Sequence, residues 1–144
     1  TRFKCDWSSD VCSSDLQGKK EVANATAYVQ RLNIKVHSVG QLISSLSGGN
    51  QQKAMIAKWL SVNPSVIIMD EPTRGIDVGA KSEIHNMLRE LSNKGIGIIL
   101  ISSELPEIIG MCDRVIVMHE GRVTGEVSGQ EITEKRIILM ASGQ

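Results

Sequence analysis

The sequence predicts an α/β protein with a largely parallel sheet flanked by helices. Two apolar runs of strand length, at residues 66–69 and 96–101, are typical of strands buried on both faces. Segments with the 3.6-residue period of amphipathic helices lie before, between and after them. Strands that alternate with helices in this way favour parallel pairing, because each helix returns the chain to the same end of the sheet.

Composition excludes several classes of function. The 144 residues carry 16 basic and 16 acidic side chains, a balance that argues against a polybasic nucleic-acid or membrane binder. No run approaches the ~20 apolar residues of a membrane span, and none resembles a secretory signal. The three cysteines are Cys5, Cys12 and Cys112, and the spacing of the first two fits no zinc site. A reducing, cytosolic setting is therefore expected.

The first residues differ from the rest of the chain. Residues 1–16 repeat the tripeptide Ser-Ser-Asp and follow neither a helical nor a strand period. They fit a disordered tail, or a translated sequencing adaptor from a fragmentary assembly, and we favour the adaptor. Residues 1–18 are therefore interpreted as a non-native or disordered segment and set apart from the fold.

The elements before the first strand are helical. Apolar residues at helical spacing predict a helix over residues 20–32, and a short helical or loop segment follows at 41–46. A second helix is expected over residues 50–60, and Pro64 ends it.

The elements after the first strand begin with the most regular helix. Asp77 is a candidate N-cap and Gly95 a candidate C-terminal stop. Between them a buried stripe is predicted at Ile84, Met87, Leu88 and Leu91. After the second strand we expect a helix over residues 102–111, with Pro106 in its first turn. An antiparallel hairpin of residues 115–118 and 122–127 and a last helix over 130–141 complete the chain.

Three places carry groups suited to chemistry. Ser47, Gly48 and Gly49 precede a helix, where unpaired N–H groups favour anions, although such glycines can also form a simple turn. Asp70 and Glu71 end a buried strand, where carboxylates can hold Mg²⁺ and position a water, or lie solvated. Residues 73–77 form a tight loop directly after the two acids, which on its own indicates a turn with an N-cap.

The order and spacing of these places resemble the ABC-type ATPases. Residues 46–52 match the signature motif of that family, residues 67–71 match Walker B with the adjacent catalytic glutamate, and residues 75–77 match the D-loop. The resemblance runs over residues 19–144. Residues 46–53, 70–81, 101–107 and 118–122 look like the C-terminal ATPase half of the tandem subunit of bacterial monosaccharide importers of the ribose, galactose and xylose type.

The resemblance implies a role for each site residue. In the family, two ATPase halves sandwich two ATP molecules. Ser47 and Gly49 would contact the γ-phosphate of ATP held by the partner half, with Gly48 and Gln51 in the same motif. Asp70 would hold Mg²⁺ through its water shell, and Glu71 would orient the hydrolytic water. Asp77 would couple the two halves, and Ser103 would stand at the catalytic switch position.

Two departures from the family pattern stand out. No G-x-x-x-x-G-K-[ST] sequence is present, and residues 75–82 are rejected as a P-loop because their lysine, Lys81, is one residue out of place and follows two acids. The chain is therefore interpreted as a C-terminal fragment without the P-loop, its strand and the glutamine loop. At the switch position, active members carry a histidine where this chain has Ser103, which cannot become cationic. His85 and His119 are expected to be solvated and to offer no substitute.

The resemblance also implies the fold, function and setting. We expect a P-loop NTPase-like core over residues 65–144 and the end of the helical subdomain over residues 19–64. The parent would be the ATPase of a sugar importer that uses ATP and Mg²⁺. It would lie on the cytoplasmic face of the bacterial inner membrane, with permease subunits, a second ATPase half, indirectly a periplasmic sugar-binding protein, and no nucleic acid. The alternatives are a degenerate regulatory half that lends only its signature motif, and an ABC ATPase outside transport.

Overall fold

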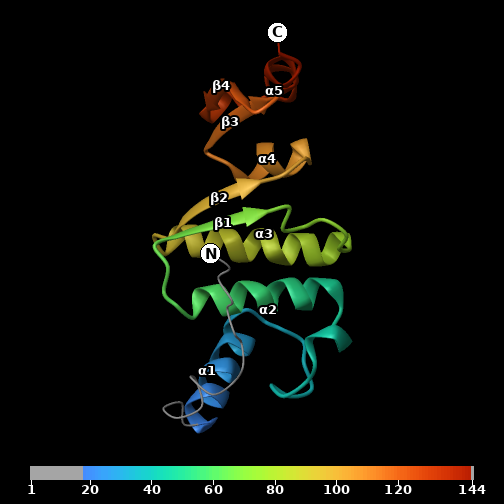
Figure 1. Cartoon of the computed structure of the whole chain (residues 1–144), viewed down its shortest axis with the longest axis vertical. Coiled ribbons are helices and arrows are strands. Elements are labelled where there is room, and N and C mark those ends of the chain that lie inside the picture. Colours follow the sequence, from blue (N-terminus) through green and yellow to red (C-terminus); the bar gives the residue numbers. More distant parts are fainter. Residues whose placement is uncertain (1–17, 144) are drawn as a thin grey trace, which may run out of the picture. The chain divides into compact units, whose positions relative to one another are not determined.

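The computed structural model describes residues 18–143 and divides the chain into two compact units between Lys58 and Trp59. Figure 1 labels the helices and strands of both units. The predicted non-native segment lies outside the described residues, apart from residue 18. None of the described helices is long and apolar enough to cross a membrane.

The first unit is helical. It contains α1 (Gly18–Arg31), a 3-10 turn η1 (Ile43–Ser45) and the start of α2 (Gly48–Leu60), which continues into the second unit. Both helices and the short turn were predicted, and each helix begins two residues earlier than expected. Leu32 and Ile34 are buried just after α1, and Lys53 on α2 is buried with its Nζ 3.1 Å from the carbonyl oxygen of Asn33.

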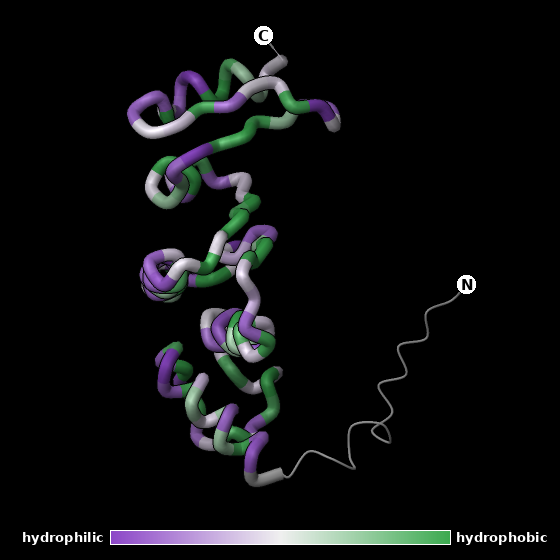
Figure 2. Tube along the Cα trace, turned by 90° about the vertical axis from the view of Figure 1, so that its left-hand side faces the viewer, coloured by the Kyte–Doolittle hydropathy of each residue, from purple (hydrophilic) through white to green (hydrophobic). Residues whose placement is uncertain are grey.

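The second unit begins with a β-α-β arrangement. Strand β1 (Val66–Asp70) pairs in parallel with β2 (Gly97–Ile101), and α3 (Val78–Asn93) connects them. The buried residues of α3 are the four that the apolar stripe predicted. Figure 2 shows how hydrophilic and hydrophobic residues alternate along the chain. Gly95 has a φ of +88°, a left-handed conformation that glycine adopts without the strain a Cβ would introduce, so the predicted stop is confirmed.

The rest of the second unit surrounds a separate apolar cluster. Helix α4 (Leu105–Met111) leads to an antiparallel hairpin of β3 (Arg114–His119) and β4 (Arg122–Ser128), followed by a 3-10 turn η2 (Gly129–Glu131) and α5 (Glu134–Ala141). Leu100 of β2 packs against this cluster. The buried members of the cluster come from α4, β3, β4 and α5 and are Ile108, Val115, Val117, Val127 and Ile137.

Two predictions about these elements are wrong. The last helix does not run over residues 130–141, because η2 and an extended Thr133 come first and the α-helix begins at Glu134. Strand β1 is buried on one face only: Ile67 and Met69 are buried, whereas Ile68 is 67% exposed. Only one face is covered by the described residues, so the continuous apolar run does not become a strand buried on both faces.

Candidate functional site

Asp70 and Glu71 lie where the parallel pair ends. Asp70 is the last residue of β1, is exposed, and lies opposite Ile101 in the register of the sheet. Glu71 has a φ of +47°, which is uncommon for a residue with a Cβ and turns the chain sharply away from the strand. Its backbone N–H donates to the carbonyl oxygen of Ile101 at 2.8 Å. This bond continues the β1–β2 pairing by one residue and fixes the backbone of Glu71 just beyond the strand.

The carboxylate of Glu71 is held by the connection that follows β2. The backbone N–H of Ser103 donates to Glu71 Oε1 at 2.9 Å. The two residues predicted as catalytic therefore meet, although the contact uses the main chain of Ser103 and not its hydroxyl group. A carboxylate that accepts a backbone N–H has a fixed orientation, which suits a group that must position a water.

Asp77 lies at the other end of the loop that starts at Glu71. Its side chain accepts a hydrogen bond from the backbone N–H of Ala80 at 2.9 Å, so the predicted N-cap of α3 is confirmed. Gly75, between the two acids, has a φ of +75° and allows the loop to turn before the helix. Asp77 is itself exposed.

Lys81, rejected above as a P-loop lysine, has another partner. Its ammonium group contacts both carboxylate oxygens of Glu104, with Nζ 2.7 Å from Oε2. The backbone N–H of Glu104 donates to the hydroxyl oxygen of Ser102 at 3.0 Å. This ion pair connects α3 to the segment that carries Ser103.

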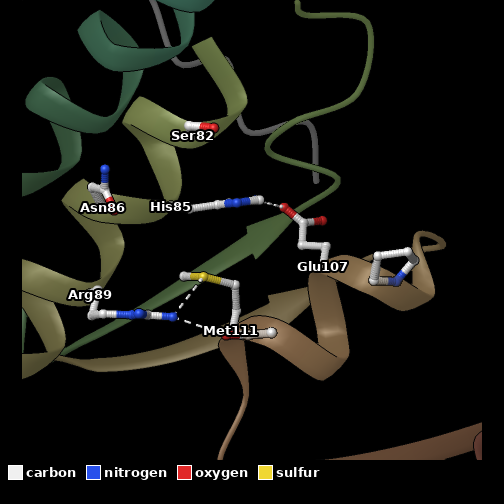
Figure 3. A pocket seen from close by; sticks show the side chains of 8 residues that line it. Ser82, His85, Asn86, Arg89, Glu107 and Met111 are labelled. Atoms are coloured by element: carbon white, nitrogen blue, oxygen red, sulfur yellow. Dashed lines mark hydrogen bonds and ion pairs between the residues drawn. The ribbon is translucent and has the colours of Figure 1, made fainter. Parts of the chain in front are cut away.

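A buried polar cluster lies between α3 and α4, and the sequence analysis missed it. Figure 3 shows His85 of α3 pointing at Glu107 of α4, with His85 Nε2 2.7 Å from Glu107 Oε1. The hydroxyl of Thr73 donates to the same oxygen at 2.9 Å. The expectation that His85 is solvated is therefore wrong, because α4 presents a carboxylate to the face of α3 on which His85 lies.

Glu107 is a charged group in an enclosed place. Its side chain is 2% exposed, and Oε2 is buried without a hydrogen-bond partner among the described residues. Burial raises the pKa of Glu107, but the nearby Ser102 hydroxyl, the His85 ring and the Thr73 hydroxyl together lower the pKa below its ordinary value. The group is therefore a carboxylate at neutral pH. The only signal in the sequence was an acid in the first turn of a helix, which a helix dipole explains equally well.

The Ser47 motif lies in the first unit, at the start of α2. The hydroxyl oxygen of Ser47 accepts from Asn50 Nδ2 at 2.9 Å, and Gln51 Nε2 donates to the carbonyl oxygen of Leu46 at 2.8 Å. Gly48 is exposed and Gly49 is buried. These side-chain bonds fix the turn into the helix, whose first N–H groups form a potential anion site.

The acidic residues form no metal cluster on their own. Within residues 18–143, no group of three or more His, Cys, Asp or Glu residues is placed to hold a metal ion. Mg²⁺, however, is usually held by one or two carboxylates together with substrate phosphates and waters. The exposed carboxylate of Asp70 at the strand end fits such a partial set of ligands.

The comparisons with known proteins agree on a family. The family model described as ABC transporter matches residues 6–74, beginning inside the segment that we interpret as non-native. The chain is 62% identical over 128 residues to a ribose import ATP-binding protein of Rhizobium meliloti, covering 89% of this chain and 25% of the relative. It is 52% identical over 125 residues to the ribose import ATP-binding protein of Bacillus subtilis, covering 87% and 25%. The chain thus spans about a quarter of the length of these relatives.

Solved structures give the same answer for the fold. A nucleotide-free ATP-binding cassette from an ABC transporter aligns with a TM-score of 0.75 and 29% identity, over 84% of this chain and 47% of that one. The protein cbiO1 of Clostridium perfringens, part of an ABC transporter complex, aligns with a TM-score of 0.71 and 29% identity, over 90% and 51%. By sequence and by fold, the chain is similar to the ATP-binding proteins of ABC transporters.

Proposed function

We propose that this chain is part of the ATP-hydrolysing subunit of an ABC importer that takes up a monosaccharide. The observation that carries the proposal is the placement of Glu71, which directly follows the strand-end Asp70 and is held by the backbone of Ile101 and Ser103. Such a carboxylate beside a metal-binding acid is suited to hydrolysis of a nucleotide. The relatives are named ribose import ATP-binding proteins, which supports a monosaccharide as the transported substrate.

Each residue has a part in this proposal. Asp70 would hold Mg²⁺, which neutralises phosphate charge when it is bound, and Glu71 would orient the attacking water. Ser47 and Gly49, with Gly48 and Gln51 in the same turn, would contact the γ-phosphate of ATP held by a second ATPase half, and Asp77 would couple the halves. Permease subunits would be the partners at the membrane, on its cytoplasmic face, with a periplasmic sugar-binding protein acting through them.

One observation favours a second candidate, a half that lends its signature motif while its own site hydrolyses little ATP. Ser103 stands where a histidine would stabilise transition-state charge, and a hydroxyl cannot carry that positive charge. His85 does not replace it, because the ring is bound to Glu107. On this view the two ATP sites of the assembly are unequal.

A pair of substitutions in the full-length subunit tests both candidates. With permease and partner half assembled, Ser47→Arg is expected to abolish ATP-driven sugar uptake, because a bulky cation would fill the phosphate turn. Glu71→Gln is expected to lower uptake much less if this half's own site is weak. Ser44→Arg is the matched control, since Ser44 is exposed and lies outside the motif.

The relative losses of sugar uptake in Ser47→Arg and Glu71→Gln decide between the two candidate functions. Equal, near-complete losses for Ser47→Arg and Glu71→Gln would mean that both sites hydrolyse ATP. A larger loss for Glu71→Gln than for Ser47→Arg would overturn the asymmetric assignment. Full uptake with Ser47→Arg would overturn the role of the signature turn itself.

A further inference from the structure

A buried carboxylate of α4 joins the loop after β1 to helices α3 and α4. Glu107 Oε1 accepts from Thr73 Oγ1 at 2.9 Å and lies 2.7 Å from His85 Nε2. Thr73 belongs to the loop after β1. Figure 3 shows the other two residues, His85 on α3 and Glu107 in the first turn of α4. One oxygen atom thus joins three segments that are far apart in the sequence.

Thr73 lies in the loop that carries the site residues Glu71 and Asp77. Thr73 is 1% exposed, lies two residues after Glu71, and comes four residues before Asp77. Its hydroxyl is therefore an anchor near the start of the loop that carries both acids. That loop is also held by the bonds from Glu71 to Ile101 and from Ser103 to Glu71, and by the N-cap at Asp77.

The partner in α4 is suited to act as a rigid anchor. The Glu107 side chain is almost completely enclosed, and a buried carboxylate is retained only where donors compensate for the lost water. His85 supplies a second donor on the same oxygen, so the carboxylate stays in place whether or not the loop moves. Charge-assisted bonds of this kind are shorter and stronger than neutral ones.

We propose that Glu107 is a positioning residue: through Thr73 it fixes the loop from Glu71 to Asp77, and His85 holds its carboxylate from the other side. The proposal rests on the ATP-hydrolysing function above. Because the loop carries both the water-orienting Glu71 and the coupling Asp77, its displacement lowers turnover whichever ATP site performs the hydrolysis.

A pair of substitutions at Thr73 separates positioning from packing. Thr73→Val keeps the shape of the side chain and removes the hydroxyl, whereas Thr73→Ser keeps the hydroxyl and removes a methyl group. In the full-length subunit assembled with its partners, Thr73→Val is expected to lower kcat for ATP about tenfold with little change in KM, the size of effect that one bond to a charged group supports. Thr73→Ser is expected to stay within about twofold of the wild type.

A distant threonine controls for the substitution itself. Thr124 is exposed, and its hydroxyl donates to the carbonyl oxygen of Val117 at 3.2 Å within the β3–β4 hairpin. Thr124→Val makes the same side-chain change and removes a threonine hydrogen bond outside the loop, and it is expected to leave kcat unchanged. Equal losses at both threonines would attribute the effect to general destabilisation and overturn the proposal.

A second readout keeps the proposal independent of the function on which it rests. Amide hydrogen exchange of the peptide covering residues 71–77, measured in the full-length subunit, is expected to speed up in Thr73→Val and not in Thr73→Ser. If the wild type hydrolyses no ATP, the proposed function fails and hydrogen exchange alone decides the positioning role. Unchanged exchange and kcat in Thr73→Val, or losses in Thr73→Ser as large as in Thr73→Val, would overturn it.

Discussion

At the scale of single residues, the charge of Glu107 links the site to pH. The pKa of this carboxyl is lowered, since the Ser102, His85 and Thr73 groups outweigh the burial that raises it. A group with a depressed pKa in the folded state stabilises the fold above its unfolded pKa, about 4.3, and this contribution is lost as the pH falls through the folded value. At neutral pH the contribution of the charge is therefore complete.

Glu107→Gln, which removes the charge and keeps the shape, tests this linkage. We expect the substitution to lower the free energy of unfolding by about 1–3 kcal/mol at about pH 7, as is typical for loss of a hydrogen bond to a charged group. The loss should be smaller at an acidic pH below the lowered pKa of the folded state, where the wild-type carboxyl also becomes neutral. Urea unfolding of the wild-type and Glu107→Gln full-length subunits at both pH values measures the difference in the free energy of unfolding. The contributions of the other carboxyl groups cancel in that difference. A difference that does not change with pH would contradict the prediction.

Cys112, at the end of α4, is predicted to be an unreactive thiol. Burial raises its pKa, and the negative charges of Asp113 and Glu107 raise it further, so the thiolate is scarce at neutral pH. Labelling by iodoacetamide at about pH 7, followed at the Cys112 peptide by mass spectrometry, should be at least about tenfold slower in the folded subunit than in urea. Equal rates in the folded and unfolded states would show that the thiol is neither buried nor perturbed.

At the scale of elements, the N-cap of α3 combines stability with a proposed function. Asp77 accepts from the backbone N–H of Ala80, and loss of such a cap costs about 1 kcal/mol. Asp77→Ala is therefore expected to lower the urea midpoint of the subunit, whereas Asp77→Asn keeps an acceptor and should remain close to the wild type. If Asp77→Asn nonetheless lowers ATP turnover, the charge of Asp77 has a role in function beyond the cap.

The elements also show how far the sequence could predict this structure. Helix α3, its stripe and its stop followed from local signals. The meeting of Glu71 and Ser103 was not predicted, although the carboxyl ends of parallel strands share one edge. The bond between His85 and Glu107 did not follow. Helical period tells which residues share a face, but it does not tell what the facing helix presents.

The split of the last helix had a similar cause. Ile132 packs against the cluster of α4, β3, β4 and α5 while Thr133 stays extended, so tertiary contacts override a pattern that reads as one helix. The apolar run of β1 predicted two covered faces for the same reason that α3 was predicted well. In both cases the apolar pattern predicts which faces are covered, and the described residues cover only one face of β1.

At the scale of the whole molecule, the exposed face of the β1–β2 pair is an apolar surface. Ile68 and Ile99 lie opposite each other in the register, 67% and 50% exposed, and Val66 and Ile101 extend the same face. Exposed apolar strands promote association between copies. The 144-residue chain alone is therefore expected to self-associate, and Ile68→Lys or Ile99→Lys should weaken the association about tenfold in sedimentation experiments.

The same substitutions should have the opposite effect in the full-length subunit. There we expect further chain to cover this face, since the aligned residues span only 25% of the relatives' length. A lysine at Ile68 would then be buried without a partner and lower stability by about 3 kcal/mol or more. Val78→Lys is the matched control, because Val78 is 80% exposed in the first turn of α3 and lies outside the sheet face. Full stability of Ile68→Lys in the long protein would mean that this face is open there as well, available to a partner and not part of the core.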